Sequence, residues 1–349
     1  MNRFLQIHAL VSYPPSNLNR DDAGYPKTAR MGGHERIRVS SQSLKRAWRI
    51  SDLFRERLAG ACGTRTKAIG VEAYDRLLKG GIKEKSADKW AISIASVFGK
   101  PKKDAGKTRE TEQLVHVTPD ELQAVYSLVE NLIAQNREPT EDELNALLGR
   151  HTAVDIALFG RMLASSPVHN VEAAAQVAHA IGVHASAIED DYFTAVDDLK
   201  PDDAEDRGAA HIGEAGFASA LFYLYVCIDR VLLLENLEGN RDLMQSTLRA
   251  LTESVLTIGP KGKVASFASR ARAHYALAEI GDQQPRSLSL AFVKPIGGND
   301  YARDANLALE KLRKNMDAVY GPCADATQSF DVLAGSGTLA EMLDFVILD

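Results

Sequence analysis

The sequence predicts an α+β protein in which one sheet is interrupted by helical and loop-rich segments. Apolar residues alternate along residues 4–12 and 217–230, a pattern typical of strands. Apolar residues recur at helical spacing along residues 241–257 and 302–319. Because both alternating sets of the 217–230 strand are largely apolar, we expect this strand in the centre of the sheet.

Shorter segments complete the predicted order of elements. Residues 36–39 alternate like a half-buried strand and continue into a helix capped by Ser41. Before that strand, prolines and Gly32-Gly33 predict a long irregular loop over residues 18–33. Apolar runs predict three further strands, at residues 154–161, 177–183 and 287–293. Strand, helix, strand, strand, helix, strand is the ferredoxin-like order, here with two interruptions.

The first interruption is predicted to be helical. Thr118 and Thr140 are each followed three residues later by a glutamate, which is the pattern of a capping box. Glycines divide residues 59–150 into short helices, and residues 100–110 form a basic run that we interpret as a solvated loop. We therefore expect a helical insertion between two parts of a sheet.

Composition limits the class of protein. The 349 residues carry a net charge of −6, and no apolar run approaches the length of a membrane span. Three scattered cysteines without a C-x-x-C pair argue against a disulfide framework and against a zinc site. The N-terminus lacks the pattern of a signal peptide, so we expect a cytoplasmic protein with reduced thiols. The GPKGK stretch at 259–263 does not have the spacing of a Walker loop.

Positive charge is concentrated near the N-terminus. Residues 27–49 hold seven basic residues and the single acid Glu35, so seven minus one gives +6 within an acidic chain. A local excess of this size indicates a binding site for a polyanion.

The arrangement of these residues fits phosphate. Free amides at the start of the helix, from Gln42, Ser43 and Leu44, would join the hydroxyls of Ser40 and Ser43. Lys45 and Arg49, spaced i,i+4, would share the outward face. The alternative is an ordinary helix cap with a solvated face, and the pattern alone leaves both interpretations open.

Three separated motifs resemble a known family. The first comprises LNRDD at 18–22, Lys27, Gly32-Gly33 and R-x-R-V-S-S-Q-S-L-K-R-A-x-R at 36–49. VDIALFGRM at 154–162 with VAHAI at 177–181 forms the second, and DYFTAVDDL at 191–199 before a glycine-containing stretch forms the third. In this order they resemble the backbone subunit of the type I-E CRISPR Cascade complex, the CasC family.

The resemblance implies a domain organisation. A palm of the RNA-recognition-motif type would comprise residues 1–58, 173–184 and 217–349, the last with a loop at 259–286. Residues 59–172 would form a helical finger insertion. Residues 185–216 would form a projecting β-hairpin, the thumb, which reaches across guide RNA bound by the neighbouring copy.

The resemblance also implies the residues that bind RNA. On the palm these are Arg20, Lys27, Ser40, Gln42, Lys45, Arg46 and Arg49. Phe193 and Thr194 of the thumb, with Met162 as an apolar wedge, would press on a displaced base. From its local pattern alone, Met162 fits a core position equally well.

We therefore expect a protein without catalytic activity, cofactor or metal. It would polymerise along the CRISPR guide RNA and bind target DNA through that guide. Other Cascade subunits would be partners, and a recruited nuclease-helicase would be an indirect one. A metal-dependent endoribonuclease using Asp21 or Asp22 is the alternative, because related effector types use a loop aspartate to cut RNA. Asp21 could equally fix its own loop by hydrogen bonding, and a basic-patch adaptor that binds no nucleic acid is a third interpretation.

Overall fold

The computed structural model describes residues 1–104, 106–149, 153–163, 166–195 and 211–348. The chain divides into two compact units. The first contains Met1–Phe54, Val177–Cys227 and Leu248–Asp349, and the second contains Arg55–Gln176 and Ile228–Thr247. Helices and an antiparallel sheet confirm the predicted α+β class.

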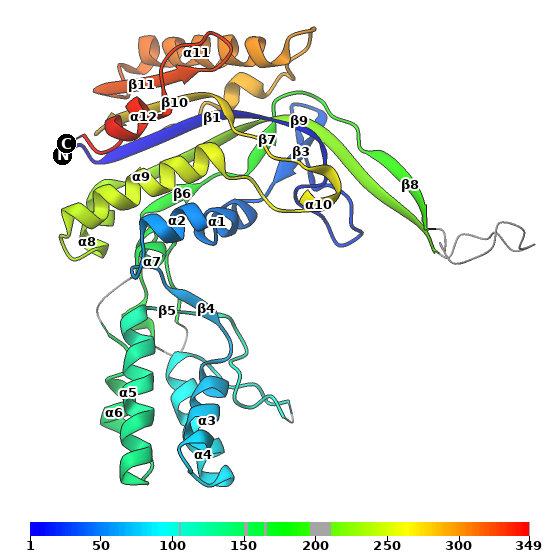
Figure 1. Ribbon diagram of the computed structural model, residues 1–349. Coiled ribbons are helices and arrows are strands. Elements are labelled where there is room, and N and C mark those ends of the chain that lie inside the picture. The colour runs from blue at the N-terminus through cyan, green and yellow to red at the C-terminus, as the bar shows by residue number, and fades with distance from the viewer. Residues whose placement is uncertain (105, 150–152, 164–165, 196–210, 349) are drawn as a thin grey trace, which may run out of the picture. The chain divides into compact units, whose positions relative to one another are not determined.

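A sheet that contains both long and short strands forms the centre of the first unit (Figure 1). Its main path runs β11-β10-β1-β9-β7-β3-β2. The strands are β1 (Phe4–Ser16), β2 (Thr28–Met31), β3 (His34–Val39), β7 (Ala180–Gly182), β9 (His211–Asp229), β10 (Ala273–Gly281) and β11 (Ala326–Asp331), with β6 (Ala175–Val177) and β8 (Glu189–Ala195) pairing separately with β9. The central position predicted for the strand at 217–230 is confirmed by β9.

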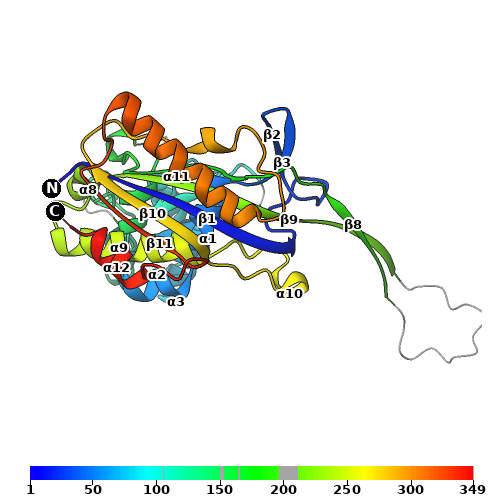
Figure 2. The same ribbon diagram turned by 90° about the horizontal axis from the view of Figure 1, so that it is seen from above.

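Helices cover both faces of this sheet. Figures 1 and 2 show α11 (Tyr301–Tyr320) across one face, and α1 (Ser41–Arg49) with α9 (Arg241–Thr257) on the other. Beneath α11, Leu309 packs in a buried cluster with Leu277 and Phe292. On the opposite face Leu44 and Trp48 of α1 are buried. The predicted helices at 241–257 and 302–319 are thereby confirmed. The short helix α12 (Leu339–Phe345) follows β11.

The segment predicted to be an irregular loop contains a hairpin. Thr28–Met31 pairs with Ile37–His34 through the Gly32-Gly33 turn, so the prediction for 18–33 is wrong at β2. Both glycines have positive φ, which residues with a side chain rarely adopt. A Cβ on Gly32 would lie 1.7 Å from the Val293 carbonyl oxygen, so this turn requires glycine.

One arginine of the basic cluster is structural. Arg36 is fully buried, and its guanidinium donates to the carbonyl oxygens of Gly182 at 3.0 Å and Phe292 at 3.1 Å. Phe292 ends the 3-10 helix η2 (Ser289–Phe292), where a strand was predicted. That prediction is wrong because the apolar run packs beneath α11 and its carbonyls bind Arg36, without strand pairing.

Two further predictions fail at short apolar segments. Residues 154–161 form the helix α7 (Val154–Phe159), which is buried nearly all round, so its sequence shows no periodicity. Strand β10 lies inside the predicted loop 259–286 and follows the four-residue helix α10 (Val264–Phe267). Its alanines and Glu279 favour a helix locally, but pairing with β1 and β11 on either side determines a strand.

The second unit is mainly helical. Its buried core lies among α3 (Ile69–Lys79), α4 (Glu84–Phe98) and α5 (Pro119–Gln135). The remaining elements are α2 (Asp52–Arg57, shared with the first unit), α6 (Glu141–Asn145), α7, η1 (Pro167–His169), α8 (Arg230–Asn236) and the two-stranded sheet of β4 (Thr64–Thr66) with β5 (Val115–Val117). Both predicted capping boxes, at Thr118 and Thr140, are present.

The basic run at 100–110 is largely neutralised by acids. Lys102 pairs with Glu110, Lys100 lies 3.3 Å from Glu112, and the Arg109 Nε lies 2.6 Å from Asp88. These ion pairs favour a structural role for this loop over phosphate binding.

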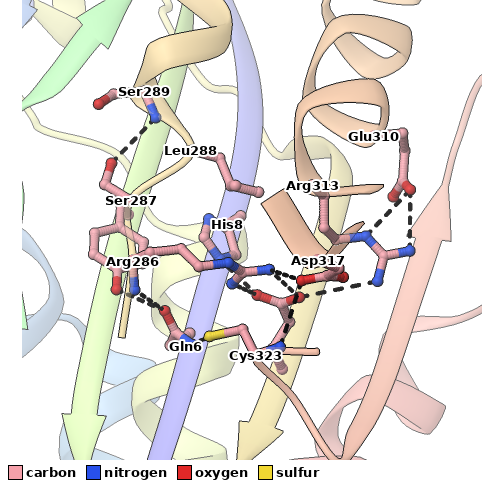
Figure 3. Close-up of polar contacts among 12 residues, drawn as sticks. Gln6, His8, Arg286, Ser287, Leu288, Ser289, Glu310, Arg313, Asp317 and Cys323 are labelled. Carbon is pink, nitrogen blue, oxygen red and sulfur yellow. Dashed lines mark hydrogen bonds and ion pairs between the residues drawn. The ribbon is translucent and has the colours of Figure 1, made fainter. Parts of the chain in front are cut away.

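A buried polar cluster joins β1, β10 and α11 in the first unit. Figure 3 shows Arg286 between Gln6 and His8 of β1 and Asp317 of α11. The His8 Nε2 lies 3.2 Å from the Glu279 carboxylate, and Arg286 binds the same carboxylate through both terminal nitrogens. Gln6 and His8 alternate with apolar residues along β1, a pattern that is typical of a strand with one solvent-facing side. Both side chains are nevertheless buried, because α11 covers that side of the strand.

This cluster should make the protein sensitive to acid. Burial alone would raise the pKa of Glu279, but hydrogen bonds from His8 and Arg286 outweigh it and hold the pKa at about 2. Burial lowers the pKa of His8. Both folded-state pKa values lie below the unfolded values, so stability is present at neutral pH and falls as His8 and then Glu279 would take up protons. Urea unfolding from about pH 7 to pH 3 should show this decline.

Replacing the buried carboxylate tests the same cluster. Glu279→Gln removes the buried carboxylate that both terminal nitrogens of Arg286 bind and leaves only the longer contact with Asp317, so we expect a loss of about 3–5 kcal/mol at neutral pH and a flatter pH profile below about pH 4. Glu310→Gln, at the partly exposed edge of the cluster, is the matched control and should cost less. An equal loss in both variants would contradict the assigned importance of Glu279.

Candidate nucleic-acid interface

The cap of α1 defines the centre of the candidate site. Ser40, and not Ser41, is the N-cap residue: its backbone is extended and its Oγ accepts from the Ser43 amide at 3.3 Å. The Leu44 amide donates to the Ser40 carbonyl. The Ser43 and Leu44 amides are therefore used within the helix, which corrects the prediction that both could bind phosphate.

Asn19 ties the preceding loop to this cap. Its side-chain oxygen accepts from the Ser40 amide at 2.9 Å, and its backbone oxygen accepts from the Lys27 amide at 2.8 Å. The Lys27 carbonyl then accepts from the Arg38 amide at 2.8 Å. These bonds hold both ends of the 19–27 loop beside the start of α1.

A hollow of about 560 Å³ lies at this junction. Three cationic residues line it: Arg20 from the loop, Arg46 from α1, and Lys261 from the segment before α10. The structure thus brings together two predicted residues, Arg20 and Arg46, and adds a third that sequence reasoning missed. A Cβ on Gly262 would lie 2.3 Å from the Leu18 carbonyl oxygen, so the GPKGK glycine permits the close approach of Lys261.

The exposed face of α1 differs from the predicted one. Gln42 and Arg46, spaced i,i+4, are exposed, whereas Lys45 and Arg49 are half-buried and engaged in contacts. Leu44, Ala47 and Trp48 form the buried face, and the Trp48 Nε1 donates to the Ile258 carbonyl at 3.2 Å. Lys45 and Arg49 lie beside this face, whereas Gln42 and Arg46 lie opposite it.

Asp21 holds its own loop. Its Oδ1 accepts from the Ala23 and Tyr25 amides, each at 3.0 Å. The Asp21 amide donates to the Tyr25 carbonyl, and Arg20 forms a bridge with Pro26. The loop-fixing role considered from the sequence is confirmed for this carboxylate.

A hairpin extends from the sheet beside this loop (Figure 1). Strand β8 pairs antiparallel with the first residues of β9, with Phe193 opposite Gly213 and Thr194 opposite Ile212. A Cβ on Gly213 would lie 2.3 Å from the Phe193 ring, so the absence of a side chain at Gly213 leaves room for that ring. Residues 196–210 of the predicted thumb lie outside the described residues.

The two predicted hairpin residues point in opposite directions. Neighbouring side chains of a strand lie on opposite faces, so Phe193 and Thr194 cannot both contact one base from the same face. Tyr192 shares the face of Thr194 and is 65% exposed. This tyrosine is a second residue that the sequence interpretation omitted, although its aromatic type was visible in DYFTA.

Met162 belongs to the second unit and is a surface residue. It is 84% exposed, so its alternative interpretation as a core residue is wrong. The neighbouring Arg161 is buried, and its Nη1 lies 2.9 Å and 2.8 Å from the two Glu121 carboxylate oxygens at the start of α5. This ion pair and the bridge from Arg161 to Val171 fix the backbone that presents Met162.

Among the described residues, no group of three or more His, Cys, Asp and Glu side chains could hold a metal ion. No helix in this part of the chain is long and apolar enough to cross a membrane. Cys62, Cys227 and Cys323 are thiols that form no disulfide with one another.

The loop geometry predicts how Asp21 substitutions behave. Asp21→Ala removes the acceptor of two amides, so exchange of the Ala23 and Tyr25 amides with solvent should become faster. Asp21→Asn keeps a side-chain oxygen and should preserve most of the protection. Asp22→Ala is the control, and hydrogen exchange with mass spectrometry is the measurement. Equal protection in all variants would show that Asp21 does not hold the loop.

A family model described as CT1975-like protein matches residues 5–343, nearly the whole chain. The chain belongs to the CT1975-like protein family. No curated protein matches the sequence.

The CT1975-like chain is similar to a chain of a structure named "CRISPR RNA-guided surveillance complex, pre-nicking", with 28% sequence identity and a TM-score of 0.85. A second similar chain comes from a "CRISPR RNA-guided surveillance complex", with 24% identity and a TM-score of 0.75. In both cases 99% of each chain is covered, so the likeness includes both compact units; at 24% identity the second shows the fold alone.

Proposed function

We propose that this CT1975-like protein is a non-catalytic backbone subunit of a type I-E CRISPR surveillance complex, and that it polymerises along the guide RNA. Its partners would be that RNA, target DNA paired to the guide, further copies of itself and other Cascade subunits. The observation that carries the proposal is the convergence of Arg20, Arg46 and Lys261 on one hollow at the start of α1.

This hollow suits an RNA backbone. Arginine and lysine donors from three segments can contact phosphate oxygens, and such contacts position a nucleic acid without reading its sequence. Gln42 adds an exposed amide on the same helix. A subunit that accepts any spacer sequence needs this base-independent binding, because pairing with DNA supplies the specificity.

The sheet supports a palm of the RNA-recognition-motif type. In chain order the central elements are β1, α1, β7, β9, α9 and β10. In space the four strands follow the order β10-β1-β9-β7, which corresponds to 4-1-3-2 and is the ferredoxin-like arrangement. Helices α1 and α9 lie on the same face (Figure 1).

The projecting hairpin supports polymerisation. Strand β8 carries the exposed aromatic residues Tyr192 and Phe193, which are not needed to cover the sheet. An aromatic side chain can replace stacking lost by a displaced base of any type. Phe193 would act in this way on RNA held by an adjacent copy, with Met162 as an apolar wedge. Thr194, with Tyr192 as an additional contact, would meet this RNA from the opposite face of the strand.

A ribonuclease function is less well supported. The Asp21 carboxylate accepts two backbone amides through one oxygen, a structural task that needs no metal. The proposed subunit therefore binds RNA without cutting it, and DNA destruction falls to a recruited nuclease-helicase. Incubation of the protein with labelled RNA and Mg²⁺ or Mn²⁺ tests this: cleavage lost in Asp21→Asn or Asp22→Asn would establish the alternative.

The palm contacts predict a salt effect. Arg20→Ala with Arg46→Ala should weaken binding to unrelated RNAs about equally and reduce the slope of log K against log salt by about two units. Fluorescence anisotropy at several salt concentrations is the measurement. Both side chains are exposed, so the melting temperature should change little.

A matched control has the same charge change elsewhere. Lys311→Ala with Lys314→Ala removes two exposed cations from α11, on the opposite face of the sheet from α1. This variant should bind RNA like the wild type. An equal loss in both variants would indicate nonspecific attraction, and no RNA binding by the wild type would favour the adaptor interpretation.

The hairpin predicts cooperative assembly. Replacing residues 190–212 with a Gly-Ser bridge should leave the palm folded, because its buried clusters lie elsewhere. Binding of one subunit to a short RNA should persist. Cooperative coating of a long guide should be lost, since the linkage between adjacent copies disappears. Unchanged cooperativity in mobility-shift titrations would contradict the thumb assignment.

The base-contacting residues predict a milder effect. Met162→Ala, Phe193→Ala and Thr194→Ala together should permit assembly but remove stacking worth about 1–3 kcal/mol per displaced base where the aromatic ring is lost. Chemical probing of the bound guide should show reactive bases at a regular interval with the wild type and a weaker pattern with the variant. Tyr192→Ala alone tests the additional contact.

A further inference from the structure

A second group of cationic and polar side chains lies in the first unit, near the cap of α1. The Arg38 Nη1 lies 2.8 Å from the His179 Nδ1, and the Arg38 Nε donates to the Thr28 carbonyl at 3.2 Å. Strand β3 pairs with β7 so that Val39 is opposite Ala180. His179 directly precedes Ala180 and Ser40 directly follows Val39, so this pairing brings the backbone of His179 close to the N-cap residue.

The hydrogen bond determines the tautomer of the imidazole. Arginine is always protonated and has no acceptor, so Arg38 must be the donor and the His179 Nδ1 must be unprotonated. Neutral His179 therefore carries its proton on Nε2. Because His179 is an exposed residue, that N–H can donate to a ligand.

The charges around His179 are positive. The pKa of His179 is lowered by partial burial, by Arg38 of β3 and by Lys27 of the loop before β2. Lys27 is itself fixed through its backbone to Asn19 and to Arg38. The free protein thus holds a neutral imidazole beside two cations, an arrangement that an anion would stabilise.

We propose that Lys27, Arg38 and His179 form a second phosphate site for the RNA strand that passes the start of α1, and that His179 takes up a proton when RNA binds. The proton comes from solvent and adds to Nδ1. A protonated Nδ1 can no longer accept from Arg38, so the Arg38 N–H is released toward the phosphate while the His179 Nε2–H donates to it. This inference rests on the proposed RNA-binding function.

The direction of the pH effect follows from linkage. In the free protein the pKa of His179 is below its usual value, and a bound phosphate raises it. Affinity for RNA should therefore increase as the pH falls from the pKa of the complex to the lower pKa of the free protein. Below the latter it should be constant, because both states are then protonated.

Matched histidine variants test the site. His179→Gln keeps an N–H donor but cannot titrate, so it should bind RNA near neutral pH and lose this pH dependence. His179→Ala should bind more weakly across the range. His34→Gln, at the exposed tip of the β2–β3 hairpin, is the control and should follow the wild type.

The measurement is the Kd for a short unstructured RNA from about pH 8 to pH 5.5 at constant ionic strength. The wild type should gain about tenfold in affinity for each unit by which RNA raises the pKa. Calorimetry in two buffers of different ionisation enthalpy should show proton uptake on binding, which is absent in His179→Gln.

The outcomes separate this inference from the proposed function. Equal pH dependence and equal proton uptake in wild type and His179→Gln would overturn the inference. If RNA binding still depended on Arg20 and Arg46, the proposed function would stand. If the wild type bound no RNA at any pH, both would be wrong. Melting temperatures of the exposed-site variants verify that each is folded.

Discussion

The position of the candidate interface depends on the hydrogen bond between the Ser40 amide and the Asn19 side chain. Asn19 thereby accepts a hydrogen bond from the amide of the N-cap residue, and it ties its own loop, about twenty residues earlier in the chain, to the start of α1. Asn17 connects the same loop to the hairpin, because its Nδ2 donates to the carbonyl of Gly24 in the loop and to the carbonyl of Gly216 in β9. The side-chain amides of Asn17 and Asn19 therefore join the loop, the cap of α1 and the base of the hairpin. The loop that carries Arg20 is thus held without an ion pair from that arginine to any described residue.

Burial divides the positive charge of residues 27–49 into two kinds. Arg36 donates to backbone carbonyls in the interior, so its charge is committed to the fold. Arg46 remains hydrated on α1 and lines the hollow with Arg20. Only a cation that can reach a phosphate releases the counterions condensed on the RNA, and a buried arginine cannot do so. A charge count along the sequence cannot make this distinction, since both arginines lie within the same basic run.

Local signals were sufficient for the long elements. Strand β9, helices α9 and α11 and both capping boxes were predicted because periodicity and cap residues act within a few positions. Segments α7, η2 and β10 were not, because their conformation depends on distant partners: β10 on β1 and β11, and η2 on the packing beneath α11.

The site shows the same division between local and distant information. Arg20 and Arg46 were predicted to bind RNA, and the structure brings them together. Lys261 was not predicted, since only the close approach at Gly262 brings it to Leu18 from far along the chain. The partial burial of Lys45 and Arg49 likewise was not predicted, since the helical repeat does not show how far the buried face around Trp48 extends.

The length of β9 has a mechanical consequence. One uninterrupted strand, His211–Asp229, begins in the hairpin and ends in the buried centre of the sheet (Figure 1). At the usual rise per residue it extends roughly 60 Å. No hinge separates its described hairpin end from its core end, so the hairpin cannot swing without disturbing the sheet. In the proposed assembly the fixed length of this strand, and not the RNA, would set the interval between displaced bases.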